Sequence, residues 1–103
     1  MAQTRLCDRR ILVTGAGSGI GHATTLRLLS EGARVVATDV YTEGLDGLPD
    51  SPSLMTFPMD VADETSVVTG TATAIEHLGG LDVLVNGAQG LGVEQFPVHG
   101  RAL

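Results

Sequence analysis

A glycine-rich segment constrains most strongly what this chain can fold into. Residues 13–21 read VTGAGSGIG, after an apolar run at residues 10–14 and before a helical pattern at residues 19–31. Glycine lets the backbone adopt positive φ and approach a bound group closely, and a helix N-terminus offers unpaired N–H groups with about half a positive charge. A pyrophosphate fits such a turn. The sequence therefore predicts a phosphate-binding turn between a strand and a helix.

The glycine spacing distinguishes between kinds of phosphate-binding turn. The pattern G-x-G-x-x-G starting at Gly15 fails because Ile20 occupies its sixth position. The pattern T-G-x-x-x-G-x-G fits, through Thr14, Gly15, Gly19 and Gly21. A P-loop is excluded because it needs a Gly-Lys-Ser/Thr sequence, and the chain contains no lysine. A merely flexible connection is the alternative, which the flanking strand and helix disfavour.

Short aliphatic runs alternate with amphipathic stretches along the chain, the pattern of β-α-β units. Strands are predicted at residues 10–14, 33–38, 53–59 and 81–86, helices at 19–31 and 65–78, and a short helix or loop at 42–52. Gly32 and Gly79 are placed to end the two helices, and Asp63 to cap the second one. The fold class is therefore α/β, an incomplete Rossmann-type parallel sheet of about four strands in the order 3-2-1-4, with helices on both faces.

The chain divides into two parts. Residues 1–89 form the predicted half-domain, and residues 90–103, which show no helical or strand period, are expected to be a loop or a disordered tail. The fourth strand would then be an uncovered edge, so we expect marginal stability or self-association through it. The first helix is expected to carry only a partly clean apolar stripe, formed by Ile20, Ala23, Leu26 or Arg27, and Leu29 or Ser30.

Composition narrows the class of partner. The formal net charge of −6 makes nucleic acid an unlikely partner, and no stretch could span a bilayer or resembles a signal peptide. A single cysteine, Cys7, excludes an internal disulfide, which fits a soluble cytoplasmic protein. His22, His77 and His99 lie far apart and are interpreted as surface residues, so no metal site is expected.

An acidic residue follows the second predicted strand. Asp39 can accept both hydrogen bonds of an adenosine ribose diol, whereas a 2′-phosphate would meet its negative charge. Ser18 and Val40 occupy the neighbouring positions where a basic residue would be sought, and neither is basic. NAD is therefore favoured over NADP as the cofactor. A solvated strand-end carboxylate is the alternative for Asp39.

Together these motifs resemble the short-chain dehydrogenase/reductase (SDR) family over about residues 9–89. The resemblance implies that the glycine turn binds pyrophosphate, Asp39 and the residue after it the adenosine ribose, and the pair after the third strand the adenine. The residues after the fourth strand are implied to contact the adenosine side of the cofactor. The implied cofactor-binding set is Thr14, Gly15, Gly17, Ser18, Gly19, Ile20, Gly21, Asp39, Val40, Asp60, Val61, Asn86, Gly87 and Ala88.

One motif departs from the family pattern. The usual N-N-A-G after the fourth strand appears here as Asn86-Gly87-Ala88-Gln89. Replacing the second Asn removes side-chain hydrogen bonds, and Gln89 adds a side chain where the family has glycine. This corner is therefore expected to be looser than in other members.

The resemblance implies an NAD-dependent oxidoreductase that transfers hydride between nicotinamide and an alcohol or carbonyl substrate, acting on CH–OH groups. Family members use a Ser and a Tyr-x-x-x-Lys pair. Because the chain has no lysine and Tyr41 is its only tyrosine, no catalytic residue is assigned, and we expect the chain alone, truncated before these groups, to be inactive. The alternative is a non-catalytic nucleotide-binding or interaction module.

Overall fold

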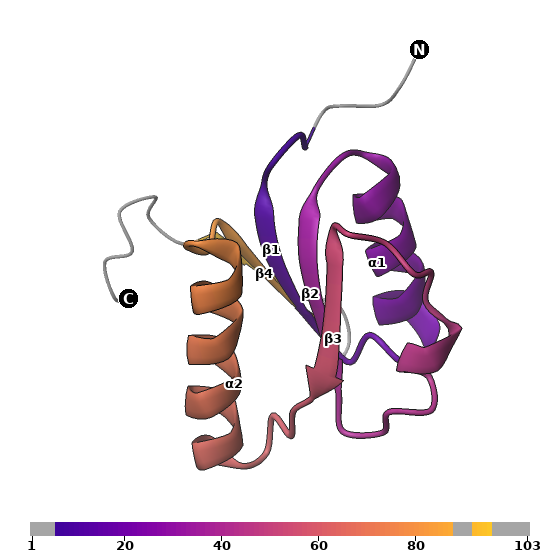
Figure 1. The fold of residues 1–103 in the computed structure, drawn as a ribbon. Helices are drawn as coiled ribbons and strands as arrows, with labels where there is room; N and C mark the ends of the chain where they lie inside the picture. Colours follow the sequence, from indigo (N-terminus) through magenta and orange to yellow (C-terminus); the bar gives the residue numbers. More distant parts are fainter. Residues whose placement is uncertain (1–5, 88–91, 96–103) are drawn as a thin grey trace.

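The structure is a computed structural model that describes residues 6–87 and 92–95. These form one sheet in the order β3-β2-β1-β4-β5 (Figure 1). The strands are β1 Arg10–Thr14, β2 Arg34–Asp39, β3 Leu54–Pro58, β4 Val83–Asn86 and β5 Gly92–Gln95. The helices are α1 Gly19–Ser30, the short 3₁₀ helix η1 Leu45–Gly47, and α2 Glu64–Leu78. The predicted parallel order 3-2-1-4 is confirmed.

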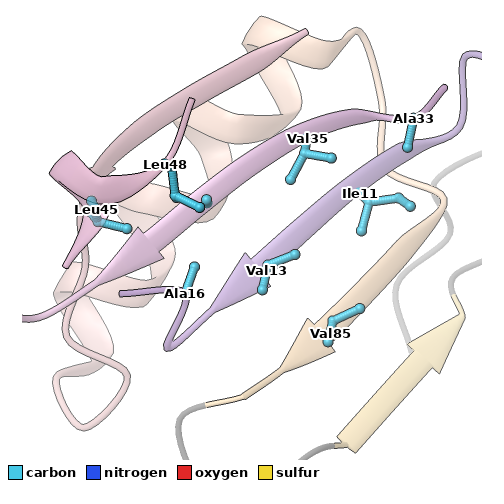
Figure 2. Close-up of a cluster of buried hydrophobic side chains, with 9 residues drawn as sticks. Ile11, Val13, Ala16, Ala33, Val35, Leu45, Leu48 and Val85 are labelled. Carbon is cyan, nitrogen blue, oxygen red and sulfur yellow. The ribbon is translucent and has the colours of Figure 1, made fainter. Parts of the chain in front are cut away.

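The two helices cover opposite faces of the sheet (Figure 1). Alternate strand residues supply the two cores, because successive side chains of a strand point to opposite faces. Ile11 and Val13 of β1 belong to the cluster shown in Figure 2, against which Leu28 of α1 packs. Leu12 belongs to a second cluster, which contains Leu78 of α2. The continuous apolar runs in the sequence thus reflect strands covered on both faces.

The expected apolar face of α1 is wrong in part. Ile20 and Leu26 are 58% and 42% exposed, whereas Gly21 and Thr25 are buried against the sheet. The Thr25 hydroxyl satisfies its hydrogen-bonding capacity by donating to the Gly21 carbonyl at 2.9 Å. Leu29, which was also expected on this face, does pack against the core, so hydrophobicity alone identified only part of the buried face.

A hydrogen-bonded cap begins α2, as predicted. The Asp63 carboxylate accepts from the N–H groups of Thr65 and Ser66 at 3.0 and 3.4 Å. Gly79 ends the helix with φ +83°. Gly32, with φ +92°, follows α1 in the same left-handed region. These caps confirm the predicted ends of both helices to within about a residue.

The tail contains a strand that the sequence analysis missed. Gly92–Gln95 pairs antiparallel with β4, with Val93 opposite Val85 and Gly92 opposite Asn86. The expectation of a loop is therefore wrong for these four residues. The expectation that the fourth strand is an uncovered edge, through which copies associate, is also wrong, because β4 pairs with β5. A single hairpin pairing needs no long apolar run, so the sequence carries no periodic signal for it. The rest of the tail, including His99, lies outside the described residues.

The opposite edge, β3, offers few backbone donors. Val35 donates to the Ser53 carbonyl and Met59 to the Asp39 carbonyl, so alternate residues of the strand face β2. Of the residues that face outward, Leu54 already donates its N–H to the Ser51 carbonyl, and Pro58 has no N–H. The N–H of Thr56 is therefore the single donor that β3 presents at this edge. A strand with so few donors is a poor template for another chain.

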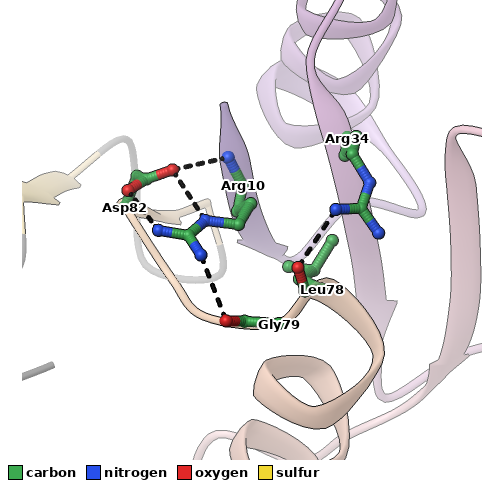
Figure 3. Close-up of polar contacts among 5 residues, drawn as sticks. All are labelled: Arg10, Arg34, Leu78, Gly79 and Asp82. Carbon is green, nitrogen blue, oxygen red and sulfur yellow. Dashed lines mark hydrogen bonds and ion pairs between the residues drawn. The ribbon is translucent and has the colours of Figure 1, made fainter. Parts of the chain in front are cut away.

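An ion pair joins elements at the amino ends of the strands (Figure 3). Arg10 contacts both carboxylate oxygens of Asp82, at 3.1 Å from Nε and 3.0 Å from Nη2, and its Nη1 donates to the Gly79 carbonyl. This pairing lowers the pKa of Asp82 and raises that of Arg10. Arg34 donates to the Leu78 carbonyl at 3.1 Å. Both guanidinium groups thus satisfy carbonyls at the C-terminus of α2.

Candidate functional site

Residues from three strands meet at the carboxyl edge of the sheet. Thr14, Asp39 and Asn86 are the last residues of β1, β2 and β4. The glycine turn leaves β1 at this edge and leads into the N-terminus of α1. In open α/β sheets, ligands bind in the crevice outside the carboxyl ends of the strands. The fold therefore brings the predicted motifs together where a ligand is expected.

The glycines of the turn meet two different physical requirements. Gly15 and Gly19 have φ of +64° and +57°, which side chains rarely adopt. A Cβ on Gly21 would overlap the Gly15 carbonyl oxygen, so its absence lets α1 pack on the turn. A Cβ on Gly17 would lie 2.9 Å from the Asp39 carboxylate oxygen Oδ2. Conformation thus explains two of the glycines, and close packing the other two.

The N-terminus of α1 lacks the protein groups that usually satisfy such an end. Ser18 is its N-cap but makes no side-chain cap hydrogen bond, and the first turn contains no acidic residue. At α2, by contrast, both Asp63 and Glu64 are present. Ile20, in the first turn of α1, is exposed. The amide groups and the positive dipole end of α1 are therefore suited to an anion.

Asp39 is held against the glycine turn. Its Oδ2 accepts from the Gly17 N–H at 2.8 Å, and its Oδ1 accepts from the Tyr41 N–H at 3.0 Å. The residue is half-buried, so a freely solvated strand-end carboxylate does not describe it. A carboxylate has about four acceptor positions, so each oxygen retains capacity for a hydroxyl donor. Val40, the next residue, is 51% exposed beside it.

The pair after β3 lies next to this carboxylate. Asp60 and Val61 line a cavity of about 50 Å³ together with Gly15, Asp39, Val40 and Met59. The backbone N–H of Asp60 donates to the Ser66 hydroxyl, and its Oδ1 accepts from the Ala62 N–H, each at 2.9 Å. These bonds fix the loop between β3 and α2. The residues implied for adenine and for ribose are thus adjacent in space.

The corner after β4 is tied to β1. The Thr14 hydroxyl donates to the Asn86 side-chain oxygen at 2.9 Å, and the Gly87 N–H donates to the Thr14 carbonyl at 3.0 Å. A Cβ on Gly87 would lie 2.8 Å from that carbonyl oxygen and 3.2 Å from the Cα of Gly21. As far as Gly87 the corner is therefore closely packed, and the expected looseness, which depends in part on Gln89, stays a prediction. Ala88 and Gln89 lie outside the described residues.

Several residues differ from their predicted roles or were not predicted at all. His22 is not a plain surface residue, since it is half-buried and its Nδ1 is shielded from solvent with no hydrogen-bond partner. His77 is exposed, as expected. Gly44, which touches the glycine turn, was missed because a glycine in a loop rich in turn residues carries no specific signal.

Neither a metal-binding cluster nor a membrane-spanning helix occurs in the part of the chain that the structure describes. No three His, Cys, Asp or Glu side chains in residues 6–87 and 92–95 are arranged to hold a metal ion. In the same part of the chain, no helix has the length and apolar character needed to cross a membrane.

Comparisons with known proteins agree with this geometry. The sequence model of the family described as short chain dehydrogenase matches residues 9–99. Levodione reductase of Leifsonia aquatica is 39% identical over 104 residues, covering 93% of this chain and 38% of that protein. L-xylulose reductase of Mus musculus is 43% identical over 84 residues, covering 81% of this chain and 33% of that protein.

A solved structure shows the same arrangement of elements. The 3-ketoacyl-(acyl-carrier-protein) reductase of Brucella melitensis, complexed with NADH, matches with a TM-score of 0.74 and 29% identity. The match covers 78% of this chain and 34% of that one. The chain thus spans about a third of the length of the curated relatives it matches.

Proposed function

Because this chain belongs to the short-chain dehydrogenase family, we propose that it binds NAD at the carboxyl edge of its sheet. In this proposal the pyrophosphate lies at the glycine turn and the N-terminus of α1, and the adenosine lies beside Asp39, Asp60 and Val61. The corner formed by Thr14, Asn86 and Gly87, together with Ala88, borders the cofactor where β4 ends. When bound, the nicotinamide would supply hydride chemistry on CH–OH groups, interconverting an alcohol and a carbonyl.

The observation that carries this proposal is the placement of the Asp39 carboxylate. The Gly17 N–H holds it beside the turn, so a ribose diol and a pyrophosphate could be bound within one cofactor's reach. The two backbone hydrogen bonds fix the carboxylate before any ligand arrives. Such preorganisation reduces the entropic cost of binding.

Charge placement supports NAD over NADP. A 2′-phosphate would add negative charge next to Asp39. Among the described arginines, Arg10 and Arg34 bind carbonyls at the C-terminus of α2, and Arg27 lies in the last turn of α1. Arg9 directly precedes β1, at the amino end of the strand. These four side chains are engaged or placed away from the carboxyl edge of the sheet, so they would not compensate a 2′-phosphate.

Titration of the chain with NADH and with NADPH tests the proposal. We expect the wild type to bind NADH more tightly than NADPH. Asp39→Asn should weaken NADH binding by about 10-fold or more, because one charge-assisted hydrogen bond is worth about 1.5–3 kcal/mol. The same substitution should reduce the preference for NADH over NADPH. Asp46→Asn is the matched control, because Asp46 is an exposed carboxylate in the loop that follows Asp39. Equal binding of NADPH by the wild type would refute the role given to Asp39.

We also propose that these 103 residues bind the cofactor without catalysing hydride transfer. The support is compositional, since no lysine is present to form a Tyr-x-x-x-Lys pair. With one cysteine and hence no internal disulfide, we also propose that the protein is cytoplasmic.

Reading the coding DNA beyond Leu103 tests the proposal that these residues do not catalyse hydride transfer. A Ser followed by Tyr-x-x-x-Lys there would assign catalysis to a longer protein, and unrelated sequence would favour a binding module.

A further inference from the structure

The loop after β2 is fixed to the protein core. Residues 42–48, called the strap below, include η1 and follow Asp39 and Tyr41. Leu45 and Leu48 of the strap are 5% and 9% exposed and belong to the buried cluster that contains Val35 and Ala16 (Figure 2). Such burial contributes about 1.5–3 kcal/mol for each leucine. The strap is therefore a fixed wall beside the glycine turn.

Gly17 is enclosed between this wall and the end of β2. Its N–H donates to Asp39 Oδ2 at 2.8 Å. On its carbonyl side Gly44 packs so closely that a Cβ there would overlap the Gly17 oxygen and come within 2.6 Å of the Gly17 Cα. Gly17 is thus held by a carboxylate at its N–H and by the strap at its carbonyl.

The conformation of Gly44 does not itself require glycine. Its φ of −69° and ψ of −28° lie in the right-handed helical region, which every residue adopts. The requirement comes from the contact with Gly17 alone. Alanine at this position would be unstrained locally, yet it would displace the strap from the turn. Since Leu45 anchors the strap, part of the displacement would fall on Gly17.

We propose that Gly44 is a positioning residue for the cofactor, which seats the strap on the Gly17 carbonyl and so holds the glycine turn in its binding geometry. The inference rests on the proposed function, and it names a residue outside the glycine turn on which that function depends. Displacing Gly17 would weaken the hydrogen bond from its N–H to Asp39 and move the carboxylate and the turn apart. Binding sites lose affinity when their geometry departs by about 0.5 Å.

The test compares Gly44→Ala with Gly47→Ala. Gly47 belongs to η1 as well, but a Cβ there would meet only His22 Cε1, at an ordinary 3.6 Å. We expect Gly44→Ala to weaken NADH binding by about 10-fold and to accelerate hydrogen exchange of the Gly17 amide. Gly47→Ala should leave both unchanged. Thermal melting of each variant shows whether it folds.

A second variant, Leu45→Val, should loosen the strap without introducing a clash. It should shift NADH affinity and Gly17 amide exchange in the same direction as Gly44→Ala.

The outcomes separate this inference from the proposed function. Wild-type affinity in Gly44→Ala, or an equal loss in Gly47→Ala, would overturn the role of Gly44. If the Gly44→Ala variant does not fold, the Leu45→Val variant decides. Wild-type NADH affinity and a wild-type rate of Gly17 amide exchange in Leu45→Val would overturn the role of Gly44. Absence of NADH binding by the wild type would overturn the proposed function and with it any role for Gly44 in cofactor binding. Amide exchange at Gly17 needs no cofactor, so it would then still show whether the strap holds the turn.

Discussion

At Gly21 the packing of α1 against the glycine turn depends on the absence of a side chain. A Cβ there would overlap the Gly15 carbonyl oxygen and lie 3.2 Å from the Cα of Ala16. Backbone atoms cannot rotate away as a flexible side chain could, so a substitution must move the helix or the turn. Gly79, which ends α2 with φ +83°, has open space around it and is glycine for conformation alone.

Two alanine substitutions should therefore destabilise the protein similarly and differ in binding. We expect Gly21→Ala to cost about 1–3 kcal/mol through overpacking and to abolish measurable NADH binding, because the N-terminus of α1 moves. Gly79→Ala should cost about 1–2 kcal/mol for its left-handed conformation and leave NADH affinity unchanged. Chemical unfolding and NADH titration check both. If Gly21→Ala binds as the wild type does, close packing at the turn is irrelevant to the site.

At the scale of elements, Asp82 links the start of β4 to β1 and, through Arg10, to the end of α2. The Arg10 guanidinium lowers the pKa of Asp82 in the folded protein. A group whose folded pKa is depressed stabilises the fold above its unfolded pKa, and this stabilisation is lost as the pH falls through the folded value. The contribution of Asp82 is therefore complete at neutral pH and disappears in acid.

We expect the free energy of unfolding of Asp82→Asn to fall below that of the wild type at neutral pH. The gap should close as the pH drops below about 3.9, the ordinary pKa of an aspartate. Urea unfolding at several pH values measures it. Asp46→Asn, which changes an exposed carboxylate, is the control and should show no such closing gap. A gap that stays constant with pH would show that the asparagine disturbs packing and that charge is not involved.

Sequence patterns predict the elements that bury a continuous apolar run or carry a cap. Strand β1 agrees with its prediction at both ends, and Asp63 caps α2 as expected. Strand β5 carries neither signal, because its four residues join the sheet through backbone hydrogen bonds to β4. The buried face of α1 was misjudged because Gly21 packs closely without being hydrophobic. Patterns of hydrophobicity thus predict burial by large side chains and miss contacts made by backbone.

The same distinction applies to the candidate site. The glycine spacing and Asp39 are visible in the sequence because each belongs to a motif with a fixed position relative to a strand. Their mutual contact, from the Gly17 N–H to the Asp39 carboxylate, depends on how the turn folds back. The approach of Gly44 depends on tertiary packing of the strap. Contacts between segments distant in sequence are therefore the part of the site that sequence patterns do not predict.

For the whole molecule, we expect low stability and association between copies. A domain of this size buries only about 60–70% of its unfolded surface. Strand β5 lies at one edge of the sheet. Sedimentation velocity at several protein concentrations should show a concentration-dependent association, and thermal melting should occur within or below the mesophile range of about 45–65 °C. A concentration-independent monomer that melts cooperatively above this range would contradict the expectation.

The scarcity of donors along β3 limits how far such association can proceed. Leu54 and Pro58 leave that border with few N–H groups, so in the part of the sheet that the structure describes β5 is the border better suited to extension. Two copies that join β5 to β5 by a two-fold axis then present a β3 border at each end. A fibre needs two complementary borders on every copy, and β3 is a poor second border for the described sheet. We therefore expect the assembly to stop at the dimer. The engaged Leu54 N–H and Pro58, both in β3, would disfavour further addition of copies at that edge.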